Sequence, residues 1–194
     1  MRKIFAAFVL VLAGCAAPGP QTTAGPKGWI VLSMVQEVAF VPAYVSIRPV
    51  GMEGDTRNLG LFGLDAFSMS QFDGLWGVAK AAALKPGTYE IYNFFLEQGG
   101  TKTQYRSRQD FSLQFEVREN EVAYLGEFRA TRTRNKSLVD WISGATPYLL
   151  RSDHRARDVA VAAKGTPELQ GVTSRTVALT PAKPTALIRA TRAD

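Results

Sequence analysis

The stretch Phe111-Ser-Leu-Gln-Phe-Glu-Val117 decides the fold class, because apolar and polar residues alternate along its whole length. The four apolar residues fall on one face of an extended chain and the three polar residues on the other. This pattern predicts a half-buried β-strand. After the polar turn Arg118-Glu119-Asn120, the alternation resumes over residues 122–128. The two segments therefore predict a hairpin with a three-residue loop.

Further strands are predicted upstream of this pair. Residues 29–35 and 44–50 are rich in β-formers and open the domain. Lys85-Pro86-Gly87 predicts a turn, since Pro presets φ and Gly supplies a positive φ. The strands that it separates cover residues 75–84 and 88–96, and the second has apolar residues on both faces, which is typical of a central strand. Residues 101–107 are more polar and predict an edge strand, whereas 64–77 predict an irregular segment with a short strand near its end. Short strands at this spacing predict an antiparallel β-sandwich.

The last third of the chain has a different character. Residues 138–142 and 146–150 are further strand candidates. Ser152 or Asp153 can cap a short helix that runs to about Lys164 and is stopped by Gly165. One face of that helix would carry apolar residues at helical spacing: Ala156, Val159, Ala160 and Ala163. Residues 166–194 have few large apolar side chains and predict a loosely ordered tail with one strand near 172–179.

Two segments resemble a known pattern. Leu84-Lys-Pro-Gly-Thr-Tyr-Glu-Ile91 is similar to an "LxPGxY" hairpin, and residues 115–126 are similar to an "F-x-V-x-x-G-x-x-x-Y-L-G" strand pair. Together they resemble uncharacterised bacterial lipoproteins with a transthyretin-like or carboxypeptidase-regulatory-like sandwich, over about residues 29–130. Asn120 stands where the pattern has Gly, and Asn also tolerates left-handed geometry. The resemblance implies a transthyretin-like or immunoglobulin-like sandwich, and it implies no chemistry.

The N-terminus predicts a lipid anchor. Arg2 and Lys3 precede a ten-residue apolar run that is too short to span a bilayer. The run ends in Leu12-Ala13-Gly14-Cys15, which resembles the bacterial lipobox. This resemblance implies that Leu12, Ala13 and Gly14 are read by signal peptidase II and that Cys15 is acylated. The alternative is an ordinary signal peptide with an incidental Cys. By similarity to enteric lipoproteins, the absence of Asp at Ala16 implies sorting to the outer membrane.

These features divide the chain into five parts. They are a signal peptide (1–14), the lipidated Cys15 with a Pro- and Gly-rich tether (15–28), a sandwich (29–150), a short helix (151–165) and the tail (166–194).

Composition excludes several classes of function. One Cys and one His cannot form an internal disulfide or a Cys/His zinc site. The net charge of +6 is concentrated in residues 129–194, which carry 12 Lys/Arg against 5 Asp/Glu. This excess is too diffuse to indicate nucleic-acid binding. No dinucleotide, phosphate-loop or EF-hand motif occurs, so no cofactor or metal is expected.

The remaining candidates for chemistry are weak. Ser152-Asp153-His154 contains the residue types of a triad, but triads assemble in space and neighbours at a helix start diverge. The acidic residues offer only chance pairs, such as Asp65 with Asp73 or Glu119 with Glu121. We therefore expect no catalytic residues and a non-enzymatic envelope protein that serves as a structural or protein-interaction module.

The alternative is a module that binds a glycan or an anionic envelope lipid. A basic run could bind anionic headgroups or an acidic protein, and otherwise is a solvated strand end: Arg129, Arg132, Arg134 and Lys136. A group of aromatic residues could stack on sugars, and otherwise belongs to the core: Trp76, Tyr92, Phe94 and Phe95.

Overall fold

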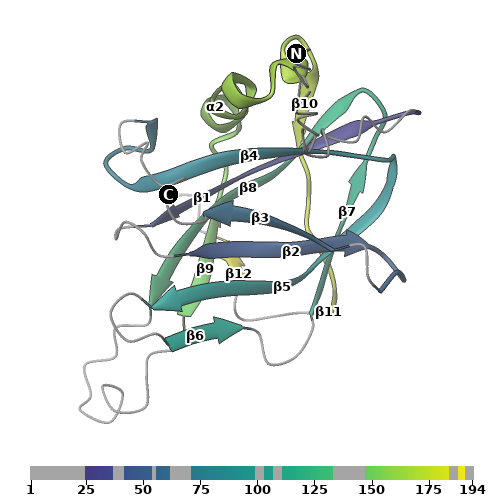
Figure 1. Ribbon diagram of the computed structural model, residues 1–194. Helices are drawn as coiled ribbons and strands as arrows, with labels where there is room; N and C mark the ends of the chain where they lie inside the picture. Colours follow the sequence, from purple (N-terminus) through teal and green to yellow (C-terminus); the bar gives the residue numbers. More distant parts are fainter. Residues whose placement is uncertain are drawn as a thin grey trace, which may run out of the picture.

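The computed structural model describes residues 25–36, 42–53, 56–61, 71–98, 103–106, 111–132, 147–183 and 188–190. These residues form two packed β-sheets and a short helix, α2 (Arg155–Gly165), which lies over the outer face of one sheet (Figure 1). The predicted fold class, mainly β with a short C-terminal helix, is confirmed. The lipobox and most of the tether lie outside the described residues.

Sheet A carries the helix. Its spatial order is β12-β9-β8-β1-β4, with β10 also beside β8. The strands are β1 (Gly28–Gln36), β4 (Trp76–Leu84), β8 (Glu121–Arg132), β9 (Pro147–Ser152), β10 (Thr173–Thr176) and β12 (Ile188–Ala190). All nine residues of β1 are buried. Ile30, Leu32 and Met34 enter the core between the sheets, whereas Trp29 and Val31 enter a second core beneath α2. A strand with both faces covered reads as a continuous apolar run, as residues 29–35 do.

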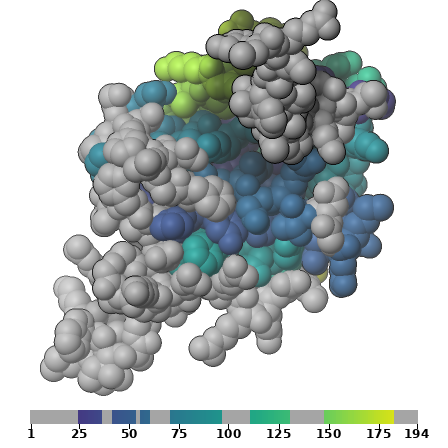
Figure 2. Space-filling view, viewed as in Figure 1, coloured from purple at the N-terminus to yellow at the C-terminus, as the bar shows by residue number. Residues whose placement is uncertain are grey.

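Sheet B is antiparallel throughout and has the order β11-β7-β5-β2-β3, with β6 beside β5. The strands are β2 (Ala43–Pro49), β3 (Arg57–Leu61), β5 (Gly87–Gln98), β6 (Thr103–Arg106), β7 (Ser112–Val117) and β11 (Thr180–Lys183). As predicted, β5 is central and β6 pairs only with β5 among the described strands. In Figure 2, β2 and β3 (blue) reach the molecular surface in the middle of the view, and α2 (yellow-green) lies at its upper edge.

The predicted hairpin at residues 118–120 is wrong. β7 belongs to sheet B and β8 to sheet A, so the three-residue connection crosses from one sheet to the other. Asn120 has the left-handed φ of 55° expected for this position, and its N–H donates to the Lys27 carbonyl at 2.9 Å. The Lys85-Pro86 turn likewise joins β4 of sheet A to β5 of sheet B. Alternation identifies a strand with one buried face, but that face is buried equally well on either sheet.

The prediction of an antiparallel sandwich holds only for sheet B. In sheet A, three pairs are parallel: β1 with β8, β8 with β10, and β9 with β12. Parallel neighbours need long connections, and β1 and β8 are separated by most of sheet B in the sequence. The spacing of strands in a sequence favours pairing between consecutive strands. In sheet A, β1 instead pairs with β8, which lies far from it in the sequence.

The helix also differs from its prediction. Its N-cap residue is His154 rather than Ser152 or Asp153 and makes no side-chain capping bond; the Asp153 carboxylate instead accepts the Arg155 N–H at 3.0 Å. Asp158 and Ala162 are the buried helix residues, whereas Ala156 and Ala160 of the predicted apolar face are exposed. The helix is therefore turned so that a carboxylate faces the sheet, which apolar spacing alone cannot indicate.

The tail contains more regular structure than its composition indicates. A 3₁₀ turn, η3 (Pro167–Leu169), follows α2, and β10 then pairs with β8 while β11 pairs with β7. The tail thus joins both sheets. Strand pairing uses the main chain and needs few large side chains. Among the tail residues that the structure describes, Leu169 and Val177 are buried in the cores, and Val172 and Leu179 pack against them. Of the other strand candidates, residues 146–150 match β9, and residues 138–142 lie outside the described residues.

Close backbone approach at Gly28 gives a test of the crossing from β7 to β8. A Cβ at Gly28 would overlap the Arg118 carbonyl oxygen and the Val117 side chain, whereas a Cβ at Gly165 has no neighbour within 4 Å. We expect Gly28→Ala to lower the free energy of unfolding by about 1–3 kcal/mol. Gly165→Ala should leave it unchanged or raise it by up to about 1 kcal/mol. Urea denaturation measures both, and equal effects would contradict the packing described.

Candidate functional site

A buried carboxylate lies between α2 and sheet A. The Asp158 side chain has no solvent exposure. Its Oδ2 accepts hydrogen bonds from the Ser33 hydroxyl of β1 and, at 2.5 Å, from the Tyr124 hydroxyl of β8. Its Oδ1 accepts from Arg157 Nε at 2.8 Å. We call Ser33, Tyr124, Glu127, Arg157 and Asp158 the Asp158 cluster.

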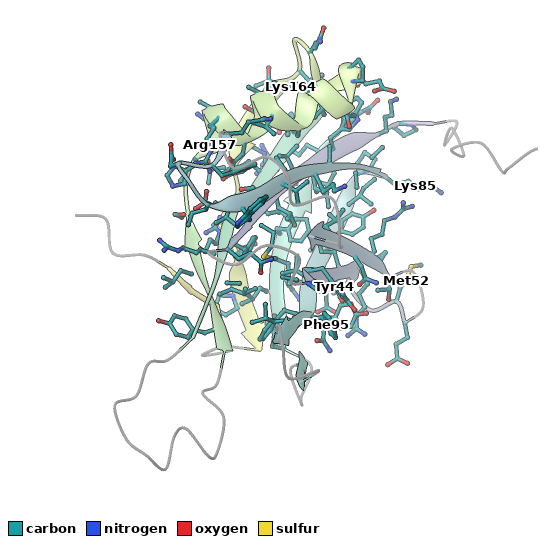
Figure 3. The ribbon with its side chains drawn as sticks, turned by 60° about the vertical axis from the view of Figure 1, so that its left-hand side comes forward. Tyr44, Met52, Lys85, Phe95, Arg157 and Lys164 are labelled. Atoms are coloured by element: carbon teal, nitrogen blue, oxygen red, sulfur yellow. The ribbon has the colours of Figure 1, made fainter. Side chains whose placement is uncertain are left out.

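Arg157 joins the cluster to its surroundings. Its guanidinium binds Asp158 and the Glu127 carboxylate of β8, and its Nη1 reaches the exposed Asp73 carboxylate at 3.0 Å. The guanidinium carbon also lies 5.0 Å from the centre of the buried Phe72 ring. Figure 3 labels Arg157 beside α2, on the side that faces the sheet. One arginine therefore neutralises two carboxylates that are shielded from water.

The surroundings fix the protonation of Tyr124 and Arg157. Burial raises the pKa of Tyr124 well above its usual value, and the hydrogen bond and negative charge of Asp158 raise it further. The Tyr124 hydroxyl stays protonated and also accepts the His154 N–H at 3.2 Å. Burial opposes ionisation of Arg157, but its bonds to Glu127 and Asp158 outweigh this and raise its pKa. The hydrogen bonds and ion pairs of the cluster therefore hold α2 against sheet A.

Ser152, Asp153 and His154 do not form a triad. The Ser152 hydroxyl donates to Glu127 Oε1 at 3.3 Å, and His154 Nε2 lies 3.8 Å from the same oxygen. Asp153 accepts instead from the Thr176 hydroxyl at 2.7 Å and from the Arg155 N–H. Burial works against ionisation of Asp153, yet these two bonds and the charges of Arg155 and Arg151 hold its pKa below the usual range. Ser152 and His154 therefore face Glu127, whereas Asp153 faces Thr176 and the start of α2.

Arg151 is a structural residue that the sequence does not reveal. Its guanidinium donates to the Leu125 carbonyl at 2.6 Å and to the Val177 carbonyl at 2.7 Å. The register of β1 against β8 shifts beside Leu125, and Gly126 has a φ of 122° that favours glycine. Arg151 thus satisfies carbonyl groups where β8 is irregular, between the parts paired with β10 and with β9.

The aromatic candidates do not gather on one surface. Phe94 is fully buried in the inter-sheet core, and Trp76 packs against that core. Phe95 lies outside this core and stacks on Tyr44 of β2, with ring centroids 5.0 Å apart and planes at 17°. Tyr92 has the Arg48 guanidinium 4.0 Å from its ring centre and shares a hydrogen bond with Thr56. The four residues therefore lie in three different environments: the inter-sheet core, the stack on Tyr44 and the contact with Arg48.

Of the basic run, Arg129 and Arg132 belong to the final part of β8. Arg134 and Lys136 lie outside the described residues, as do Leu12, Ala13, Gly14 and Cys15. Within the part of the chain that the structure describes, no group of three or more Cys, His, Asp or Glu side chains could hold a metal ion. The same residues contain no helix long and apolar enough to cross a membrane. No protein-family model, curated protein or solved structure matches the chain.

Two of the three carboxylates bound by Arg157, the buried Asp158 and the exposed Asp73, provide a test of the cluster. Asp158→Ala removes the buried partner and strands three donors, so we expect a loss of about 3–5 kcal/mol in unfolding free energy. Asp73→Asn removes the charge of the partner that is 84% exposed and suits the left-handed φ of 53° at this position, so it should cost less than about 0.5 kcal/mol. Urea denaturation of both variants measures the difference. Similar losses would show that the buried carboxylate does not hold the helix.

The raised pKa of Tyr124 predicts a change of stability with pH. Above pH 10 a tyrosine in the unfolded chain loses its proton while Tyr124 in the folded chain keeps it, so the unfolded state is favoured as the pH rises. Between pH 10 and 11 this residue should remove up to about 1.4 kcal/mol of stability. Tyr124→Phe should cost about 1–3 kcal/mol at pH 7 and should then show a shallower loss above pH 10. Parallel slopes for the two proteins would contradict the assignment.

Proposed function

We propose that this chain is a lipid-anchored, non-enzymatic protein of the bacterial cell envelope. The observation that carries the proposal is the sequence Leu12-Ala13-Gly14-Cys15 at the end of a short apolar run with a basic start. Acyl chains on Cys15 would hold the protein on a membrane, because each buried methylene contributes about 0.8 kcal/mol and two chains give stable anchoring. By similarity to enteric lipoproteins, Ala16 favours the outer membrane.

The position of the first strand supports this arrangement. Twelve residues, 16–27, separate Cys15 from β1 and contain three Pro and two Gly. A chain of that length spans at most about 40 Å. An anchor at Cys15 would therefore keep the domain within that distance of the bilayer.

The contacts of the polar residues support a structural or protein-docking role. The hydroxyl, carboxylate and guanidinium groups beneath α2 bind one another and fix the helix on the sheet. Ser152 and His154 both turn to Glu127, which leaves the only sequence-adjacent triad candidate divided. We propose that the domain presents a surface to another envelope component, with an envelope protein as the favoured partner.

Substitution of the lipobox cysteine tests the anchor. We expect Cys15→Ser to accumulate as an unprocessed precursor and to take up no radiolabelled palmitate in bacterial cells, because the acylated sulfur is gone. Mass spectrometry of the purified native chain should find acyl groups on Cys15 and no residues before it. Equal palmitate incorporation into the variant and the native chain would overturn the proposal.

A further inference from the structure

Four chain segments meet at the end of the sandwich where β1 begins. Gly28 pairs with Leu84 directly before the Lys85-Pro86 turn, and the Asn120 N–H bonds to the Lys27 carbonyl. The Val50 N–H donates to the Thr88 carbonyl at 3.1 Å, which places the turn after β2 beside the start of β5. We call these segments, 25–27, 49–53, 85–86 and 118–120, the tether end. Figure 1 shows β1 beginning and β2 ending on the same side of the domain.

The turn after β2 displays two apolar side chains. The Met52 N–H donates to the Pro49 carbonyl at 3.2 Å, and Gly51 has a φ of 78°, as in a type II turn. Val50 is 40% exposed and Met52 is 59% exposed, and they are the exposed large hydrophobic residues of the described chain. Figure 3 shows Met52 and Lys85 at one end of the sandwich. The turn thus holds the pair at the same end as the start of β1.

We propose that the tether end rests on the bilayer and that Val50 and Met52 enter its interface. This inference rests on the proposed lipid anchor. With Cys15 in the membrane, the residues nearest to the bilayer along the chain are those at the start of β1, and the short connection keeps them at high effective concentration. An apolar turn of this kind gains free energy by moving its side chains from water into the interfacial region. The partner of the apolar turn is therefore the same lipid surface that holds the acyl chains of Cys15.

Because the charges at the tether end nearly balance, apolar contact should contribute most of the free energy of docking to the bilayer. Arg118 is paired with Glu116 at 2.8 Å. The other charged side chains of the four segments are Lys27, Lys85, Glu53 and Glu119, two of each sign. Docking through this end should therefore depend little on salt or on anionic lipid. A headgroup contact through Arg129 and its neighbours would depend on salt, because it rests on charge. It would also involve another part of the domain, because Arg129 lies nine residues, about 30 Å, along β8 from Asn120.

A fluorescent label on the full lipidated chain tests the proposal. Met52→Cys and, as a control on the exposed side of α2, Ala160→Cys each provide one thiol for an environment-sensitive dye, since Cys15 is acylated. The proteins are reconstituted in phosphatidylcholine vesicles, with and without phosphatidylglycerol. We expect iodide to quench the label at position 52 several-fold less than the label at position 160, in both vesicles and up to about 0.5 M salt. Adding Val50→Asp should raise quenching at position 52 to the level at position 160, whereas Ala156→Asp should not.

Three results would overturn the proposal, and they differ in what else they affect. If mass spectrometry shows the chain to be acylated and quenching is equal at positions 52 and 160, the docking proposal is wrong and the lipid-anchor proposal is unaffected. Protection that requires phosphatidylglycerol and disappears with salt assigns the contact to charged headgroups rather than to the apolar turn. A native chain without acyl groups overturns both the anchor and the docking. Circular dichroism of each variant shows that its β structure is retained.

Discussion

The structure depends on the complete burial of β1. This strand has hydrogen-bonded neighbours on both edges, β4 and β8, and packed side chains on both faces. Sheet B covers one face of β1, and α2 with η3 covers the other. The burial of this one strand therefore depends on elements from the whole chain. The tail is included, because Leu169 completes the second core and β10 extends the sheet beside β8. The helix is therefore a constituent of the fold rather than an appendage.

Placing a polar network at the centre of this arrangement has an energetic consequence. Ser33 lies within the apolar run of β1, and Asp158 lies on the inner side of α2. Either group alone would be costly to bury without a partner, but together with Tyr124 and Arg157 each finds one. Such a set is satisfied in one orientation of the helix and not in others, so it specifies how α2 lies on the sheet in addition to holding it there.

Sequence patterns predict the strands of this protein better than their partners. The alternation at residues 111–117, the apolar run at 29–35 and the turn at 85–87 each match an element of the structure. The sheet to which each strand belongs could not be predicted, because a half-buried strand looks the same in either layer. The Asp158 cluster was missed for a related reason. Neither a serine in a strand nor an aspartate in a helix indicates a buried network by itself. Ser33 and Asp158 form one because the fold brings them together from positions 125 residues apart in the sequence.

The place of β1 also determines how the domain would respond to mechanical tension. A pull on the segment before Gly28 acts along the axis of a strand that is bonded on both edges. Under such a load the backbone bonds to β4 and β8 are sheared together instead of being opened one after another, as happens when a strand is peeled from an edge. A domain attached through its central strand therefore resists extraction more strongly than the same domain attached through β3 or β6.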